Sequence, residues 1–193
     1  MEEPLPLSTL HRAILKLLQN RDDVVLFGAQ AVNAYVKEPR MTQDIDIISN
    51  RAALLAEELH QALHQQFHIA LRVREVAQAQ GYRLYQVQKL GNRHLVDIRQ
   101  MDILPSAQRL AQILVLSPAE LIAYKVIAYH QRRGQPKAGT DWRDIAMLLL
   151  TFPELKEFDG SVKNYLSSTS PTILATWQEV VQQMIQPIDD NEF

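Results

Sequence analysis

Two aspartates one residue apart, Asp44 and Asp46, lie inside the apolar run Asp44-Ile45-Asp46-Ile47-Ile48. Isoleucine favours strands and aspartate disfavours them, so a charged pair within such a run requires a specific reason. Because side chains alternate between the two faces of a strand, both carboxylates are predicted to share one face, about 7 Å apart. Two negative charges held in this way repel each other unless a cation lies between them. The pattern therefore predicts a strand with a divalent metal site, and with it phosphoryl chemistry.

Composition narrows the class of protein without deciding its function. A chain of 193 residues with 47% hydrophobic and 22% charged residues is typical of a soluble globular protein. No apolar run reaches the roughly 20 residues of a membrane helix, and the N-terminal segment MEEPLPLSTL lacks the bases of a signal peptide. We therefore expect a cytoplasmic protein with no membrane partner. A net charge of −2 and the absence of cysteine exclude a general attraction to nucleic acid and any thiolate metal site.

The first half of the chain alternates helix and strand signals, whereas the second half is predicted to be helical. Helices are predicted at residues 8–19, 29–36 and 51–66, and strands at 23–27, 44–48, 67–73, 82–89 and 93–101. Gly91 and Asn92 separate the last two strands, which predicts a two-residue hairpin turn. After about residue 103 we expect helices throughout, at 117–133, 140–150 and 171–185, with a loop at 134–139. The sequence thus predicts an α/β half followed by a helical half.

A third carboxylate would complete the usual two-metal arrangement, and Asp97 is the candidate. It lies in the middle of a predicted strand, between Val96 and Ile98, where an unpaired charge is costly. If that strand lies beside the Asp44–Asp46 strand, three carboxylates converge on one face of the sheet. One metal would then hold a triphosphate, and the other would activate the attacking hydroxyl, whose proton Asp97 helps to remove.

The turn at Gly28 supplies a second element of such a site. A strand that ends in glycine and enters a helix presents backbone N–H groups to an anion. The small residues Ala29 and Ala31 would let a triphosphate approach closely. The turn has neither the glycines of a Walker A loop nor those of a dinucleotide fingerprint.

Taken together, these residues resemble a known family. The segment from Gly28-Ala29 through Arg40-x-Thr42-x-Asp44-x-Asp46, with Asp97 later in the chain, is similar to minimal nucleotidyltransferases of the DNA polymerase β-like superfamily. Within that superfamily it resembles the stand-alone bacterial proteins related to AbiEii-type toxins of toxin–antitoxin systems. The resemblance implies an α/β (α+β) fold with a small mixed β-sheet flanked by helices in residues 1–103, followed by a helical region in 104–193.

The same resemblance implies a reaction and its partners. The reaction would be Mg²⁺-dependent (or Mn²⁺-dependent) transfer of a nucleoside monophosphate from an NTP, such as ATP, to an acceptor hydroxyl. The acceptor could be a protein, an RNA 3′ end or a small molecule, and an antitoxin protein is a further expected partner. The implied catalytic residues and metal ligands are Asp44, Asp46 and Asp97, and the implied nucleotide-binding residues are Gly28, Ala29, Arg40 and Lys125. Ala29 departs from the Gly or Ser that is usual in the family, which leaves open a non-catalytic binding module.

The second half adds a weaker likeness to the same family. Lys125, Ala128 and Arg132 follow one stripe of a predicted helix, and Asp141 and Asp144 follow on the next. They resemble the Lys-x-x-Ala-x-x-x-Arg and Asp-x-x-Asp region of AbiEii-type proteins, in which the lysine is thought to reach the nucleotide phosphates.

Structural alternatives remain open for several of these residues. Asp44 and Asp46 could form a solvated strand edge, and Arg40 could simply pair with one of them. Asp97 could form a salt bridge with Arg93 or Arg99, or Asp102 could take its place. Lys125 could be a solvated helix residue, and Asp141 and Asp144 could pair with Arg132, Arg133 or Arg143.

Two further clusters favour structural explanations. His60, His64 and His68 have helical spacing, but without cysteine or a His-Glu-x-x-His motif a zinc site is not expected. A basic cluster of Arg132, Arg133, Lys137 and Arg143 could meet a phosphate backbone or form a solvated turn.

Overall fold

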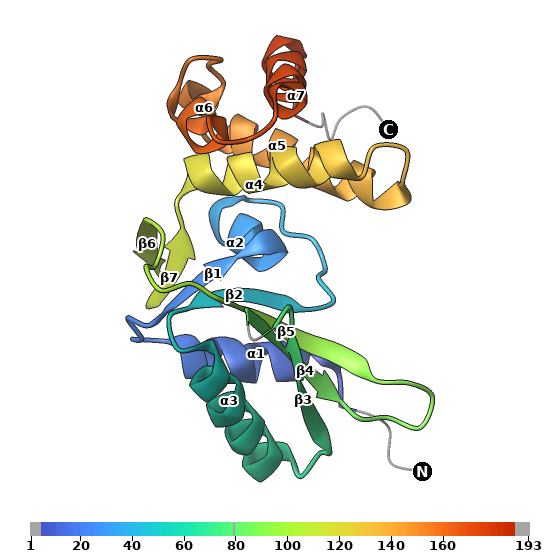
Figure 1. The fold of residues 1–193 in the computed structure, drawn as a ribbon. Coiled ribbons are helices and arrows are strands. Elements are labelled where there is room, and N and C mark those ends of the chain that lie inside the picture. Colours follow the sequence, from blue (N-terminus) through green and yellow to red (C-terminus); the bar gives the residue numbers. More distant parts are fainter. Residues whose placement is uncertain (1–4, 79, 188–193) are drawn as a thin grey trace. The chain divides into compact units, whose positions relative to one another are not determined.

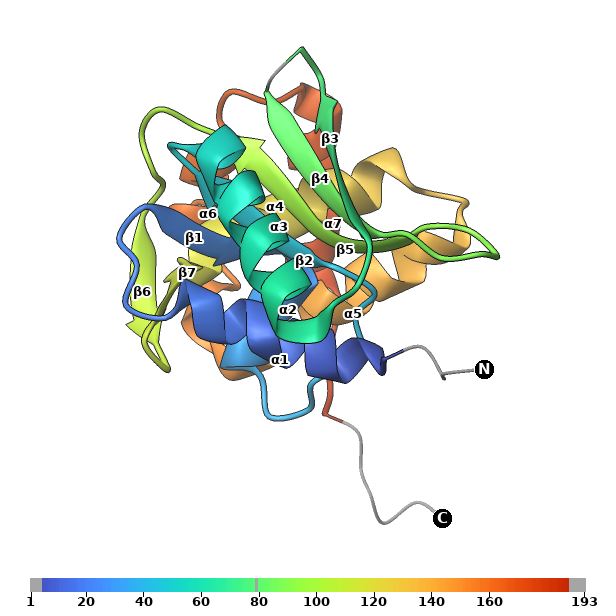
Figure 2. The ribbon, with the colours of Figure 1, turned by 90° about the horizontal axis from the view of Figure 1, so that it is seen from below.

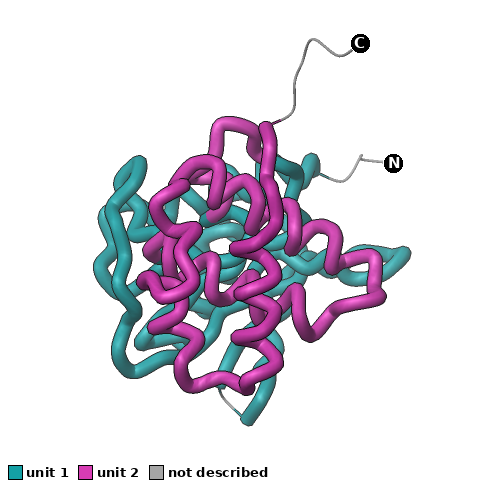
Figure 3. The backbone as a smooth tube through the Cα atoms, turned by 90° about the horizontal axis from the view of Figure 1, so that it is seen from above, with its two compact units in different colours: residues 1–31, 40–116 teal, residues 32–39, 117–193 magenta. Residues whose placement is uncertain are grey.

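The computed structural model describes residues 5–78 and 80–187. These residues form two compact units, residues 1–31 with 40–116 and residues 32–39 with 117–193 (Figure 3). Strands and helices alternate up to residue 116, and helices follow (Figure 1). The elements in chain order are α1 (Leu7–Leu18), β1 (Val24–Phe27), α2 (Gly28–Tyr35), β2 (Ile45–Ser49), α3 (Ala52–Phe67), β3 (Leu71–Val76), β4 (Gly81–Gln86), β5 (Arg93–Gln100), β6 (Ala107–Leu110), β7 (Ile113–Leu116), α4 (Pro118–Gln131), α5 (Pro136–Thr151), the 3-10 turn η1 (Pro153–Leu155), α6 (Ser161–Leu166) and α7 (Pro171–Gln182).

The first unit is built on a mixed sheet. Within the described residues the sheet has seven strands in the order β3-β4-β5-β2-β1-β7-β6. Strand β2 pairs antiparallel with β1 and parallel with β5, and β1 pairs parallel with β7. The predicted α/β fold with a mixed sheet and flanking helices is therefore confirmed.

Two amphipathic helices, α1 and α3, cover one face of this sheet (Figures 1 and 2). On α1 the buried face carries Leu10, Ile14 and Leu18, and on α3 it includes Leu55 and Leu59. The spacing of three to four residues places each set on one helix face, and burying each such side chain contributes about 1.5–3 kcal/mol. This packing leaves the opposite sheet face for polar side chains of β2 to β5.

The predicted tight turn at Gly91-Asn92 is wrong, although the strands on either side of it do pair. Strand β4 already ends at Gln86, and β5 begins at Arg93. The chain between them makes its own turn, in which the Gly91 N–H bonds the Gln88 carbonyl at 3.3 Å. The Val87 N–H bonds the Ala70 carbonyl at 2.9 Å, so the loop begins by following β3 instead of closing at once.

The prediction of helices alone after residue 103 is also wrong. Residues 107–116 form the antiparallel hairpin β6–β7, which extends the sheet beside β1. Its two loop residues, Ala111 and Gln112, have φ angles of 44° and 69°, as a type I′ turn requires. Neither residue is one that usually marks such a turn, so no local pattern predicts the hairpin.

The second unit is helical, as predicted, with two differences of detail. Helix α5 begins at Pro136, inside the predicted loop, because proline is well suited to a first helical position. The short helix α6 was not predicted. Within the unit, α4 packs against α5, α6 and α7, and the largest fully buried side chain is Trp177. Among the described residues, no helix combines the length and apolar character that crossing a membrane would require.

Candidate functional site

The strand register places two of the predicted carboxylates side by side. Asp46 on β2 lies opposite Asp97 on β5, and on the other side it lies opposite Phe27 of β1. Residues directly opposite each other on neighbouring strands project from the same face. Asp44 lies in the bend just before β2 and not in the strand itself, so strand alternation alone does not set the direction of its side chain. The expected position of the Asp97 strand beside β2 is therefore observed.

Gly28 lies in close contact with this acidic face. Its φ angle is +67°, in the left-handed region that glycine adopts without steric penalty. A Cβ atom on residue 28 would lie 2.0 Å from Asp46 Oδ2 and 2.9 Å from Asp46 Cβ. The Asp46 carboxylate therefore occupies the space of the missing side chain, next to the first turn of α2. Backbone N–H groups in that turn have no partner within the helix and favour anions.

His94, which the sequence did not single out, holds Asp44. Its Nδ1 lies 3.0 Å from Asp44 Oδ2, and its Nε2 lies 3.0 Å from the Val96 carbonyl oxygen. Acceptors on both ring nitrogens favour the doubly protonated ring. The hydrogen bond to Asp44 raises the pKa of His94, and the charges of Asp44 and Asp97 add to this increase while burial opposes it.

A β-bulge brings His94 to the acidic face. Leu84 pairs with Val96 but Tyr85 pairs with His94, so Leu95 is an extra residue in β5. Along a regular strand, residues 94 and 97 would project from opposite faces. Because of the bulge, His94 and Asp97 project from the same face of the sheet. The His94 ring also stacks on the Tyr85 ring, with centroids 5.0 Å apart.

Asp97 also has a cationic partner, on β4. Arg83 lies opposite Asp97 in the sheet, and its Nε donates to Asp97 Oδ2 at 3.0 Å. This hydrogen bond raises the pKa of Arg83. A salt bridge to Asp97 is therefore present, but its partner is Arg83 and not the expected Arg93 or Arg99. Arg93 instead donates to the Leu5 carbonyl.

The chemistry of the acidic face suits a magnesium-type ion. Asp44, Asp46 and Asp97 offer only carboxylate oxygens, the donors that Mg²⁺ prefers. In the part of the chain that the structure describes, however, no three His, Asp or Glu side chains are gathered closely enough to hold a metal. His94 and Arg83 each bond one oxygen of a carboxylate, on Asp44 and Asp97, so a metal would share these two carboxylates with a protein partner or displace it. The metal-ligand assignments remain predictions.

A cavity of about 690 Å³ lies within the first unit, beside the segment that leads to Asp44. Arg40 and Thr42 line one side, together with Gln30, whose Nε2 donates to Thr42 Oγ1 at 2.7 Å. Residues of α1, among them His11, line the other side. Burial lowers the pKa of His11, against the opposing effects of the Gln43 carbonyl and the Asp44 charge. The predicted nucleotide contact of Arg40 thus lies at a cavity large enough for a small molecule.

Lys125, the other predicted nucleotide contact, lies in the second unit. It is buried, and its Nζ lies 2.7 Å from Asp144 Oδ2 and 3.7 Å from Asp141 Oδ1. Asp141 in turn pairs with Arg132 at 2.8 Å, as one structural alternative predicted. The alternative that Lys125 is a solvated helix residue is wrong, and its nucleotide contact remains a prediction.

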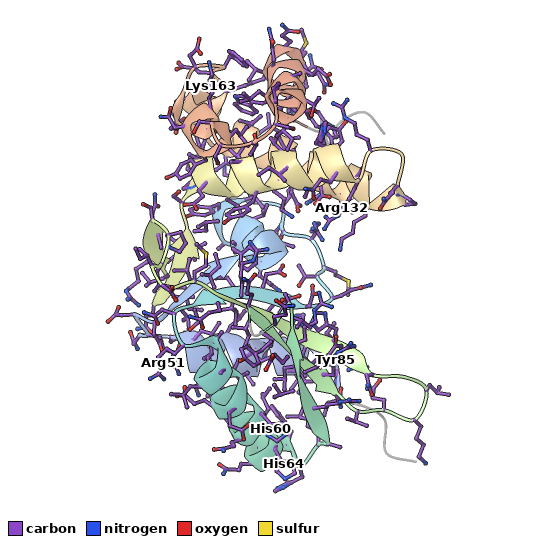
Figure 4. The ribbon with its side chains drawn as sticks, viewed as in Figure 1. Arg51, His60, His64, Tyr85, Arg132 and Lys163 are labelled. Carbon is purple, nitrogen blue, oxygen red and sulfur yellow. The ribbon has the colours of Figure 1, made fainter. Side chains whose placement is uncertain are left out.

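The side chains of the basic cluster and of the histidine cluster contact other parts of the fold. In the basic cluster, Arg133 pairs with Glu179 and Arg143 donates to the Glu38 carbonyl at 2.9 Å. His60 and His64 stack on α3 with ring centroids 6.4 Å apart (Figure 4). His68 terminates that helix in a left-handed conformation.

Comparison with known proteins identifies a family. The model described as "Nucleotidyl transferase AbiEii toxin, Type IV TA system" matches residues 12–193, nearly the whole chain. No curated protein matches the chain.

Solved structures share the fold at low sequence identity. Megavirus polyadenylate synthase superimposes with a TM-score of 0.60 at 13% identity, over 76% of this chain and 32% of the synthase. This chain thus spans about a third of that protein. JHP933 from Helicobacter pylori gives 0.58 at 15% identity, over 90% and 87% of the two chains. ANT(2″)-Ia, solved in complex with adenylyl-2″-tobramycin, gives 0.52 at 13% identity, over 89% and 96%.

Proposed function

The chain belongs to the AbiEii nucleotidyltransferase toxin family, and we propose that it transfers a nucleoside monophosphate from an NTP to an acceptor hydroxyl. One observation carries this proposal, namely the register that sets Asp46 opposite Asp97 on the face that Gly28 adjoins. Like charges on neighbouring strands are destabilising, so a sheet with no function at this face would gain nothing from this pair. A nucleotidyltransferase requires such a pair.

Asp44, Asp46 and Asp97 would hold Mg²⁺ or Mn²⁺. When bound, the metal supplies positive charge for the triphosphate and lowers the pKa of a coordinated hydroxyl. Asp97 is proposed to accept the proton of the acceptor hydroxyl. The attacking oxygen forms a bond to the α-phosphorus, and pyrophosphate leaves.

The phosphates are proposed to bind at the start of α2. The backbone N–H groups of the first turn of α2, which have no partner within the helix, would favour an anion there. The Asp46 carboxylate fills the space beside Gly28, so a metal held by the acids would lie between Asp46 and the phosphates. Arg40 is proposed to add a positive charge from the cavity wall, and Lys125 to contact the nucleotide as well. ATP is one candidate donor, and an antitoxin protein is the proposed regulatory partner.

The experiment that tests the proposal is transfer of radiolabel from the α-phosphate of each NTP into RNA, protein or small molecules. Label should appear only with Mg²⁺ or Mn²⁺. Asp97→Asn should reduce the rate by about 10²- to 10⁴-fold, the usual loss on removal of a general base. Asp102→Asn removes the exposed carboxylate that follows β5 and should retain most of the activity. Transfer that is unchanged in Asp46→Asn and Asp97→Asn would contradict the proposal.

A non-catalytic binding module is the second candidate, and two observations favour it. Ala29 stands where Gly or Ser is usual in the family, and two carboxylates already have protein partners. Such a module would show no transfer with any NTP. Thermal unfolding with and without Mg²⁺-NTP identifies a partner-binding module that binds no nucleotide, because only a nucleotide-binding protein is stabilised by the ligand. Asp44→Asn/Asp46→Asn should abolish that response if the acids hold the metal. A nucleotide-binding module would be stabilised as an enzyme is, and the absence of label transfer distinguishes it.

A further inference from the structure

We propose that the exposed face of β3, β4 and β5 binds a single-stranded nucleic acid, whose end is the acceptor of the transfer. This inference rests on the proposed function and narrows its acceptor to one chemical class. It arises from the cross-strand register, which continues the acidic face into a strip of arginine and aromatic side chains.

The first row of this strip begins at the acids. Asp46 lies opposite Asp97, Asp97 opposite Arg83, and Arg83 opposite Arg74. Because directly opposed residues project from one face, two arginines follow two aspartates across four neighbouring strands. The row from β2 to β3 spans three strand spacings, about 14 Å in all. A small-molecule acceptor or a single protein hydroxyl has no need of so wide a charged surface.

The second row runs parallel to the first. His94, which bonds Asp44, lies opposite Tyr85, and Tyr85 lies opposite Arg72. The stacked rings of Tyr85 and His94 form an aromatic step on this face. Arg72, Arg74, Tyr85 and Asn92 line a hollow of about 170 Å³. Aromatic rings beside arginines are the usual platform on which unpaired bases stack.

Two of the three arginines in the strip have no acidic partner among the described residues. Arg83 is paired with Asp97, but within the described ranges 5–78 and 80–187 neither Arg72 nor Arg74 has an ion-pair partner. Both are exposed, and they lie two residues apart on one face of β3. Phosphodiester groups along a single strand would neutralise them, while bases stack on the aromatic step and the terminal hydroxyl reaches the carboxylates.

Binding can be measured by fluorescence anisotropy with labelled single strands of about 12 nucleotides, within the usual site size of such surfaces. RNA and DNA strands of one sequence form separate arms. Arg72→Ala/Arg74→Ala should weaken binding at least tenfold. The slope of log K against log salt should become shallower by about 1.4, since each lost phosphate contact contributes about 0.7.

The matched control removes two lysines elsewhere. Lys37 and Lys137 are exposed, and Lys37→Ala/Lys137→Ala changes the net charge by the same amount. It should bind the strands as the wild type does, and Arg72→Lys/Arg74→Lys should retain most of the binding. Thermal unfolding of every variant shows whether the fold is intact.

Three outcomes overturn the inference. These are equal binding by wild type and Arg72→Ala/Arg74→Ala, an equal loss in the lysine control, and transfer to a protein or small molecule that the arginine variant leaves unchanged. Binding that depends on Arg72 and Arg74 without any transfer of label would support the surface and contradict the proposed function. A preference for RNA or for DNA identifies which acceptor the surface takes.

Discussion

At the scale of single residues, Gly28 gives the sharpest test of how the site is built. A Cβ atom at this position would overlap the Asp46 carboxylate, and the φ angle of +67° is unfavourable for any other residue. Gly28→Ala should therefore lower the free energy of unfolding by at least about 1–2 kcal/mol, the cost of the left-handed conformation alone, and should displace Asp46. Urea unfolding measures the first effect, and nucleotide transfer measures the second.

Gly139 is the matched control. It lies inside helix α5, and a Cβ atom there would have no neighbour within 4 Å. Gly139→Ala should stabilise the protein by about 0.5–1 kcal/mol, because alanine favours the helix. If both substitutions had the same effect, the close contact between Gly28 and Asp46 would not be what requires glycine.

The residues of the candidate site differ in how far the sequence reveals them. Asp44, Asp46 and Asp97 stand out because each is a charge inside an apolar run. His94 does not stand out, since it reaches the acidic face only through the bulge at Leu95. Counting alternate positions along β5 would place His94 on the wrong side. The pairing of Arg83 with Asp97 could not be predicted for a related reason. It depends on the register of β4 and β5, which the length of the loop between them sets.

At the scale of elements, regular patterns predicted the structure and irregular turns did not. Helices α1 and α3 lie close to their expected positions because their apolar spacing is unambiguous, and α4 does so because Ser117-Pro118-Ala119-Glu120 marks a helix start. The hairpin β6–β7 was missed because Ala111 and Gln112 adopt positive φ angles without the glycine or asparagine that usually marks them. The pairing of β7 with β1, which is far away in sequence, stabilises the hairpin although its turn residues do not favour it.

Four charged side chains link the segment before β1 to the first turns of α3 and the residue before it, and they make the stability of the fold depend on pH. Arg21 and Arg51 each bond both Asp23 and Glu58, at 2.6–2.8 Å. The hydrogen bond from Arg21 lowers the pKa of Asp23, and the charges of Arg21 and Arg51 add to this effect against burial. A lowered pKa means that the folded protein releases the Asp23 proton more readily than the unfolded chain.

The Asp23 contribution to stability is therefore complete above the unfolded pKa of about 3.9. It is lost as the pH falls through the lower folded value. Asp23→Asn should destabilise the protein by about 1–2 kcal/mol at neutral pH, and the difference from wild type should shrink below about pH 4. Urea unfolding at several pH values measures this. Asp102→Asn is the control, since the Asp102 side chain is exposed and should change little; an equal pH dependence there would contradict the assignment.

At the scale of the whole molecule, the two units are not simply two halves of the sequence. Residues 32–39 belong to the second unit, although residues 1–31 and 40–116 on either side of them form the first. Helix α2 begins in one unit and ends in the other. No local sequence pattern predicts that residues 32–39 belong to the second unit, because a short apolar helix has the same pattern in either unit.

The insertion of residues 32–39 predicts that the helical unit does not fold from residues 117–193 alone. In the second unit the Tyr35 ring meets Phe152 edge-on at 5.5 Å, and Arg143 donates to the Glu38 carbonyl. Val32 and Val36 are buried, and each buried valine contributes about 1.5–3 kcal/mol.

A fragment of residues 117–193 should therefore unfold without a cooperative transition in circular dichroism. Joining residues 32–39 to it through a flexible linker should restore the transition, and Tyr35→Ala in the joined fragment should weaken it again. A cooperative transition of equal midpoint in both fragments would show that the inserted segment contributes nothing to the stability of this unit.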